Sequence, residues 1–125
     1  MPSHKNARKA AEAAACAGDQ GQYWEMHDLL LQNYRALGAD QLPGYAERLG
    51  LNTATFTSCL EAGTHSKGID ADLAEARKAG VSATPMFFLG TLDEKTGKMQ
   101  PIEMLRGAQS YASFKAAIDK ALAAK

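Results

Sequence analysis

The sequence predicts an α-rich α/β domain in which five helices precede a C-terminal β-hairpin and a final helix. Across residues 4–79, apolar residues recur at spacings of three and four, and glycines separate the segments. The pattern then changes to the continuous apolar run Met86–Leu89, which is typical of a strand covered on both faces. With 125 residues, the chain is long enough for one compact domain with one core.

The first two predicted helices span residues 4–17 and 22–35. Ser3 is a suitable N-cap for the first, which is rich in alanine, the strongest helix former. The second carries the single tryptophan, and we expect it to pack against other helices rather than line a peptide groove. Its expected apolar face consists of Tyr23, Trp24, Met26, His27, Leu30, Leu31 and Tyr34.

Three further helices are predicted over residues 42–49, 53–62 and 65–79. Pro43 fits a first helical turn, where its missing N–H costs nothing, and Asn52 is a strong N-cap. In the fifth helix, which Gly80 ends, the residues expected to point inward are Ile69, Leu73 and Ala76.

The hairpin is predicted to pair Met86–Leu89 with Ile102–Arg106, joined by the polar stretch 91–98. Ser110 can then cap a last helix with an apolar stripe at spacings of three and four. An isolated hairpin is at best marginally stable in water, so strands that look buried on both faces require a further covering element. We therefore expect a homo-oligomer, with segment exchange between chains as one form of it.

Composition and charge exclude several classes of protein. The 14 basic and 14 acidic side chains cancel, so the chain lacks the positive charge that nucleic-acid binding requires. No stretch approaches the length of a membrane span, and no apolar run follows the basic N-terminus as it does in a signal peptide. Taken as written, the sequence predicts no export by a signal of its own, and a cytoplasmic location if Met1 is the native start.

Thr84-Pro85 stands directly before the predicted first strand. Proline lacks the N–H that a sheet ladder needs, so it suits the first position of a strand. An X-Pro bond at such a junction is a good candidate for the cis form, because cis costs only about 0.5–1 kcal/mol before proline.

Several segments carry a resemblance to a known family by their order and spacing: His4–Ala14, Cys16–Gly21, Tyr23–Leu30, Leu49–Leu51 with Phe56, Cys59 and Leu60, Gly80–Phe88, and Leu105–Ala108. Together they resemble DsbA-like thiol–disulfide oxidoreductases. The resemblance implies a truncated thioredoxin-like fold, with residues 4–79 as a helical insertion and 80–125 as cis-Pro loop, hairpin and last helix. The family's strand, Cys-x-x-Cys helix and second strand would all precede His4.

The resemblance also implies a site and a substrate class. Ala83, Thr84 and Pro85 correspond to the loop against which family members hold extended protein thiol substrates. Because this sequence has no Cys-x-x-Cys, we expect no catalytic residue, no cofactor and no redox activity. The alternative is a non-catalytic peptide-binding or regulatory module, and a glutathione-dependent isomerase is a weaker third reading. The family is often periplasmic or extracytoplasmic.

The two cysteines, Cys16 and Cys59, lie on different predicted helices and do not form a redox pair. They are either buried free thiols or, as in many DsbA-like proteins, a structural disulfide. Export to an oxidising compartment would favour the disulfide, and a cytosolic location would favour the free thiols. A disulfide closing this loop would stabilise the fold by about 4 kcal/mol. Zinc ligation with His27 and His65 fits the residue types, but no pair has a ligand spacing, so we expect no metal site. We expect His27 on a core or groove face, and His4 and His65 exposed at helix starts.

Overall fold

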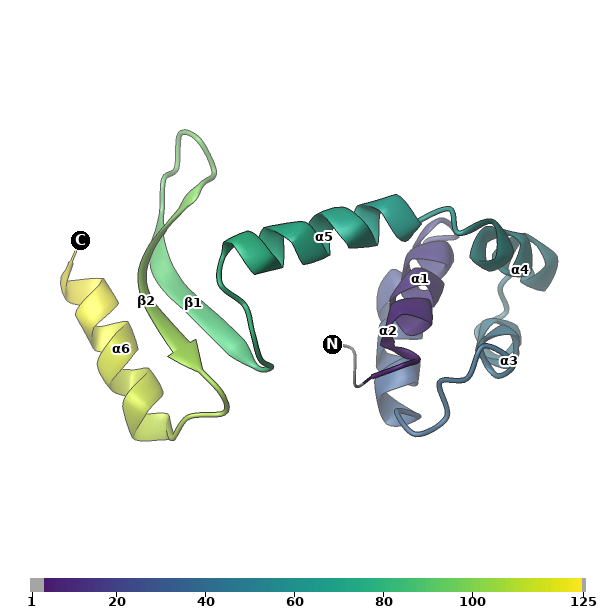
Figure 1. Cartoon of the computed structure of the whole chain (residues 1–125), viewed down its shortest axis with the longest axis horizontal. Coiled ribbons are helices and arrows are strands. Elements are labelled where there is room, and N and C mark those ends of the chain that lie inside the picture. Colours follow the sequence, from purple (N-terminus) through teal and green to yellow (C-terminus); the bar gives the residue numbers. More distant parts are fainter. Residues whose placement is uncertain (1–3, 125) are drawn as a thin grey trace. The chain divides into compact units, whose positions relative to one another are not determined.

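The computed structural model describes residues 4–124 and contains the predicted elements in the predicted order (Figure 1). The α-rich α/β class is therefore confirmed for the part of the chain that is described. The elements are α1 (Ala7–Gly18), α2 (Tyr23–Gln32), α3 (Leu42–Arg48), α4 (Thr53–Ala62), α5 (Ser66–Lys78), β1 (Met86–Leu92), β2 (Met99–Arg106) and α6 (Tyr111–Ala123).

The chain divides into two compact units, which we call the helical unit (Met1–Ala76) and the hairpin unit (Arg77–Lys125). In the helical unit, α1 packs against α2 and α4, and α3 packs against α4. The core at their centre includes Phe56 and Met26, which are fully buried. Ala13 and Ala17 of α1 are also fully buried, and their small side chains let the neighbouring helices approach closely.

The ends of the helices follow local sequence signals. Asn52 caps α4 as predicted, because its side-chain oxygen accepts a hydrogen bond from the N–H of Thr55 at 2.9 Å. Gly63 ends the same helix in the left-handed conformation, with a φ of 60°. The predicted cap Ser3 lies outside the described residues, and α1 begins at Ala7. Helix α2 ends at Gln32, three residues before the predicted end.

Two predicted apolar faces are only partly correct. On α2 the buried residues are Met26, Leu29 and Leu30, whereas Trp24 is 67% exposed. This short helix carries apolar side chains around much of its circumference, so its periodicity alone does not select the packed side. Helix α5 has no buried residue, and Leu73, which was expected to point inward, is 40% exposed.

A buried carboxylate fixes the start of α5 to α1. The Glu12 side chain is 2% exposed, accepts hydrogen bonds from Lys9 Nζ at 2.6 Å and Ser66 Oγ at 2.8 Å, and lies 3.5 Å from Arg8 Nε. Arg8 also donates to Asp70 on α5 at 2.7 Å. Burial would raise the pKa of Glu12, but the hydrogen bonds and the two positive charges outweigh it and lower that pKa.

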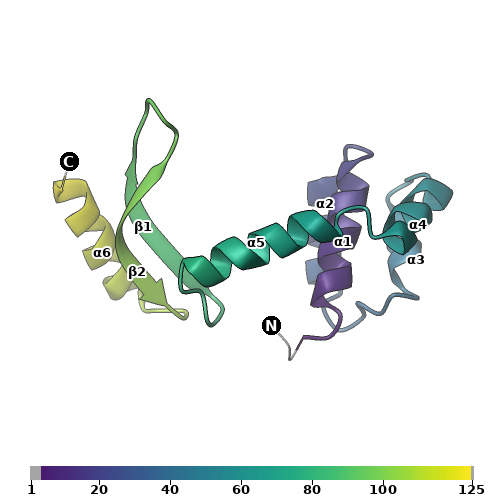
Figure 2. The same ribbon diagram turned by 45° about the horizontal axis from the view of Figure 1, so that its top comes forward.

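The hairpin unit consists of β1 and β2 in antiparallel pairing, with α6 lying along one face in both views (Figure 1, Figure 2). Phe87 packs edge-to-face on Phe114 of α6, with ring centroids 4.9 Å apart. Among the described residues of this unit, only Ala117 is buried. The expectation that Met86–Leu89 is buried on both faces is therefore wrong within the hairpin unit, where these residues are exposed or half-buried.

The Glu12 network predicts that acid destabilises the helical unit. The lowered pKa means that Glu12 stabilises the folded state above about pH 4.3, the usual pKa of glutamate, and that this contribution disappears as the pH falls through its folded value. Glu12→Gln should lower the free energy of unfolding by about 1–3 kcal/mol at pH 7, and the difference from wild type should shrink in acid. Urea unfolding at pH 7 and pH 3, followed by circular dichroism, measures both quantities.

Glu61→Gln is the matched control, because Glu61 is an exposed glutamate of α4. It should follow the wild-type curve at both pH values. A difference between wild type and Glu12→Gln that does not change with pH would contradict the assignment.

Candidate functional site

The loop before β1 presents exposed residues that the sequence assigned to substrate binding. Gly80 follows α5 and has a φ of 77°, and the chain turns there into the loop. Thr84 and Pro85 are exposed and Ala83 is half-buried. The peptide bond between Thr84 and Pro85 is cis. The three residues form the surface directly ahead of the first strand.

Arg106, at the end of β2, holds this loop in place. Its guanidinium donates to Ser82 Oγ at 2.8 Å, and the N–H of Gly107 donates to the carbonyl of Pro85, also at 2.8 Å. Sequence reasoning missed this role, although the predicted hairpin contained the signal. Arg106 pairs with Met86 in the register, so it must lie beside the residues that precede β1.

Strand β1 has an open edge. The described sheet has two strands in the order β1-β2, so the edge of β1 away from β2 has no strand beside it. An edge strand presents main-chain N–H and C=O groups to whatever extended segment approaches it. The exposed loop and the open edge are therefore continuous along the chain.

A β-bulge gathers apolar side chains on the sheet face away from α6. Leu89 pairs with Glu103 but Gly90 pairs with Pro101, so Ile102 is an extra residue in β2. One inserted residue reverses the alternation of side chains, which puts Pro101 on the same face as Phe88. Gly90 is required here, because a Cβ atom would collide with the carbonyl oxygen of Gln100.

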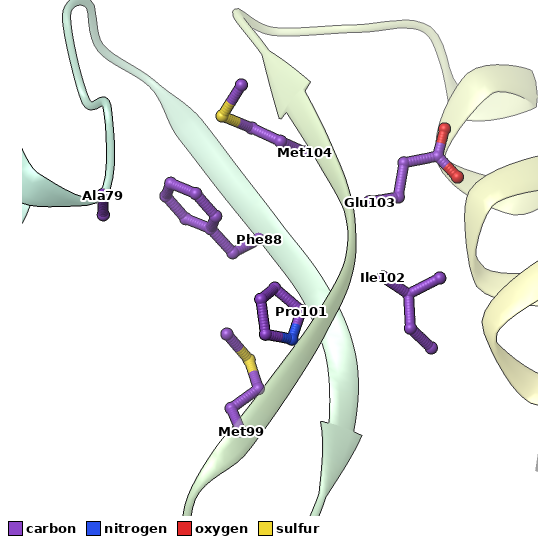
Figure 3. Close-up of a pocket in the computed structure, with 7 residues that line it drawn as sticks. All are labelled: Ala79, Phe88, Met99, Pro101, Ile102, Glu103 and Met104. Atoms are coloured by element: carbon purple, nitrogen blue, oxygen red, sulfur yellow. The ribbon is translucent and has the colours of Figure 1, made fainter.

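This face has a hollow of about 490 Å³ lined mainly by apolar side chains. Figure 3 shows Phe88, Pro101 and Met104 on the side of Ala79, whereas Glu103 points toward α6. Glu103 Oε2 lies 3.5 Å from Lys120 of α6. Met99 and Met104 are 48% and 46% exposed, so the hollow is an open apolar surface.

The two cysteines are joined in a disulfide that links α1 to α4, with their Cα atoms 6.0 Å apart. Cys16 is buried and Cys59 is half-buried. Of the two alternatives for this pair, the structure thus shows the disulfide rather than free thiols. Because both cysteines of the sequence are engaged, the chain has no free thiol in this state.

Two polar side chains surround the exposed side of this disulfide. His65 Nε2 lies 2.8 Å from Asp19 Oδ2, and the same carboxylate oxygen lies 3.7 Å from Cys59 Sγ. A ring nitrogen of His65 and the two sulfur atoms all lie within 4.8 Å of one another. His65 is therefore a partnered, half-buried residue rather than the exposed one that the sequence predicted.

The other two histidines do not join this group. His4 is exposed, as expected. His27 lies on the outer side of α2, where its Nδ1 is 3.0 Å from Asp28 Oδ1 and its ring contacts Tyr23 and Trp24. This aromatic group is on the surface, so the core packing expected for Tyr23 and Trp24 is absent, whereas Met26 is buried as expected.

Comparison with known proteins identifies one family and several longer relatives. A family model described as DSBA-like thioredoxin domain matches residues 1–119. The chain is 46% identical over 86 residues to a protein of Salinispora arenicola named Na(+)/H(+) antiporter NhaA 1. The aligned region is 69% of this chain and 13% of that protein. It is 33% identical over 102 residues to Na(+)/H(+) antiporter NhaA of Herminiimonas arsenicoxydans, covering 77% of this chain and 16% of that protein.

The chain therefore spans only a small part of the length of these relatives. In residues 4–124, every helix is too short or too polar to cross a bilayer. No solved structure matches the chain.

Proposed function

This chain belongs to the family of DSBA-like thioredoxin domains, and we propose that it binds extended protein or peptide segments without catalysing thiol–disulfide exchange. The observation that carries this proposal is the continuity of an exposed loop, Ala83–Pro85, with a strand that has one open edge. The family's substrates, which are protein thiols, are the class of ligand that such a surface fits.

Binding would occur by strand addition. An extended segment beside β1 pairs its main chain with the open edge, so affinity does not depend on one particular side chain. The hydrogen bonds from Arg106 and Gly107 hold the loop before any ligand arrives, which reduces the entropy lost on binding. The open apolar hollow beside Phe88 offers a place for the ligand's side chains.

The lack of catalysis follows from the cysteines. Thiol–disulfide exchange requires an accessible thiolate and a resolving thiol close to it. This sequence has no Cys-x-x-Cys, and its two cysteines are bonded to each other across two helices. We therefore assign no catalytic residue.

This proposal predicts binding without turnover. Reduction of insulin by dithiothreitol, followed as the loss of intact disulfide-bonded insulin by chromatography, should proceed at the same rate with and without the chain. Reduced and alkylated insulin chains, used as extended probes, should bind, and Thr84→Arg should weaken that binding by about tenfold because a bulky charge obstructs the loop.

Ala123→Arg is the matched control, because it adds the same charge at an exposed position near the end of α6. It should bind the probe as wild type does. Accelerated insulin reduction that survives Cys16→Ser with Cys59→Ser would refute the non-catalytic assignment, and equal binding by the two arginine variants would refute the loop assignment.

We further propose that a second copy of the chain covers the open face of the hairpin unit. Large apolar side chains, including Phe88, Met99 and Met104, line that face, and the net charge of zero offers little repulsion between copies. Exchange of strands or helices between copies is one way to complete the sheet.

Light scattering after size-exclusion chromatography should therefore give twice the mass of one chain. Met104→Lys should shift the protein to monomer, because a charge in the hollow cannot be buried in a dimer. Tyr111→Lys is the control, because Tyr111 is 83% exposed and does not line the hollow. A wild-type protein that remains a cooperatively folding monomer would refute this arrangement.

The similarity to longer proteins named Na(+)/H(+) antiporter favours a second candidate, a regulatory module of a membrane transporter. None of the described helices is long and apolar enough to cross a membrane. In this reading, the segment that matches these relatives would act on a transporter domain rather than on a free protein substrate.

A chimera tests this candidate. The matching segment of the Salinispora arenicola protein is replaced by this chain, and Na⁺/H⁺ exchange is measured in vesicles. Exchange should persist when the segment is deleted, and a thiol reductant should change the exchange rate of the chimera but not of the deletion variant. Identical responses of the two proteins would exclude a regulatory role.

A further inference from the structure

We propose that reduction of the disulfide turns Cys16, Cys59 and His65 into a site for Zn²⁺. The two sulfur atoms and a ring nitrogen of His65 already lie within 4.8 Å of one another. Two thiolates and an imidazole are ligands that zinc prefers. This inference is independent of peptide binding, because all three residues belong to the helical unit.

The spacing suits a tetrahedral ion. With Zn–S bonds of about 2.3 Å and a Zn–N bond of about 2.0 Å, neighbouring ligand atoms lie about 3.5–3.8 Å apart. Once the sulfur–sulfur bond is broken, rotation of the two cysteine side chains can provide this separation. The Cα atoms are 6.0 Å apart, which leaves room for an ion between the two side chains.

The fold holds the three ligands from three directions. Cys16 projects from α1 and is 2% exposed, so core packing fixes its position. Cys59 is in the last turn of α4, and His65 follows the left-handed Gly63 that reverses the chain. The N–H of Thr64 donates to the carbonyl of Cys59 at 3.2 Å, which ties this turn to the helix end.

Asp19 acts as a positioning residue for His65. Its Oδ2 lies 2.8 Å from Nε2 of the imidazole and 3.7 Å from Cys59 Sγ, so it holds the ring beside the two sulfur atoms. A carboxylate behind a zinc-bound histidine is the usual second partner in such sites. Because Cys59 and His65 are only half-buried, water has access to the fourth coordination position.

The redox step balances with a dithiol reductant. The reductant gives two electrons and two protons to the disulfide, forms its own disulfide, and leaves Cys16 and Cys59 as thiols. Zn²⁺ then displaces the two thiol protons, and the two thiolates neutralise its charge in the partly buried site. Oxidation by a disulfide of the same class reverses the sequence and releases the ion.

Cobalt titration of the full chain tests the proposal, because Co²⁺ occupies zinc sites and its thiolate charge-transfer bands report sulfur ligation. The chain reduced with a phosphine under anaerobic conditions should bind one equivalent of Co²⁺, and Zn²⁺ should displace it. The oxidised chain and the variant with both Cys16→Ser and Cys59→Ser should show no such bands.

His65→Ala should weaken Zn²⁺ binding by about 100-fold or more, and Asp19→Asn by about 10-fold. His27→Ala is the matched control, because it removes a histidine of the same unit that lies apart from Cys16, Cys59 and His65. The affinity of this variant for Zn²⁺ should equal that of wild type. Circular dichroism of each reduced protein, with and without Zn²⁺, accompanies the titration. If reduction unfolds the chain, Zn²⁺ should restore the helical signal in wild type and His27→Ala but not in His65→Ala.

Two results would overturn the site. One is a reduced, wild-type chain that neither shows the charge-transfer bands with Co²⁺ nor regains helical signal with Zn²⁺. The other is equal Zn²⁺ affinity in His65→Ala and His27→Ala, which would mean that the histidine is not a ligand.

Discussion

A two-stranded sheet packed against one helix has a second face and two edges that these three elements themselves leave uncovered. In the hairpin unit this constraint accounts for the exposure of Met99 and Met104, for the open edge of β1 and for the accessibility of the loop at Thr84. The bulge at Ile102 strengthens the effect, because it moves further apolar side chains onto the uncovered face. The unit's capacity to bind other chains and its need for a covering partner thus have the same physical origin.

The helical unit is organised differently, because it buries its apolar residues among its own helices. Phe56 and Met26 fill the centre, the disulfide joins α1 to α4, and the charged Glu12 is fully partnered within the unit. A core of this kind positions side chains at its boundary reproducibly. Cys59, His65 and Asp19 lie at that boundary, where the interior meets solvent. Chemistry at this location depends on the oxidation state of the two cysteines, because their sulfur atoms either bond to each other or coordinate an ion.

Local signals in the sequence were sufficient for the order and approximate bounds of the elements. Asn52 and Gly63 mark the ends of α4, and the apolar run at Met86 marks β1. Which side of a helix is buried was less predictable, because Trp24 and Met26 are both apolar and only tertiary packing separates them. The grouping of His65 with the cysteines was missed for a related reason. No pair has a ligand spacing along the chain, and the group exists only because α1 and α4 pack together.

The bond between Cys16 and Cys59 also makes a covalent ring of the chain segment that contains α2 and α3. A protease that cuts the exposed connection between those two helices would leave both fragments attached, because the ring holds them after the peptide bond is lost. After such a cut, the covalent link between the two parts of the helical unit is the bond between Cys16 and Cys59. Where a metal ion takes over from the disulfide, the ring is closed by coordination instead, and acid or a competing chelator can open it without any change in oxidation state.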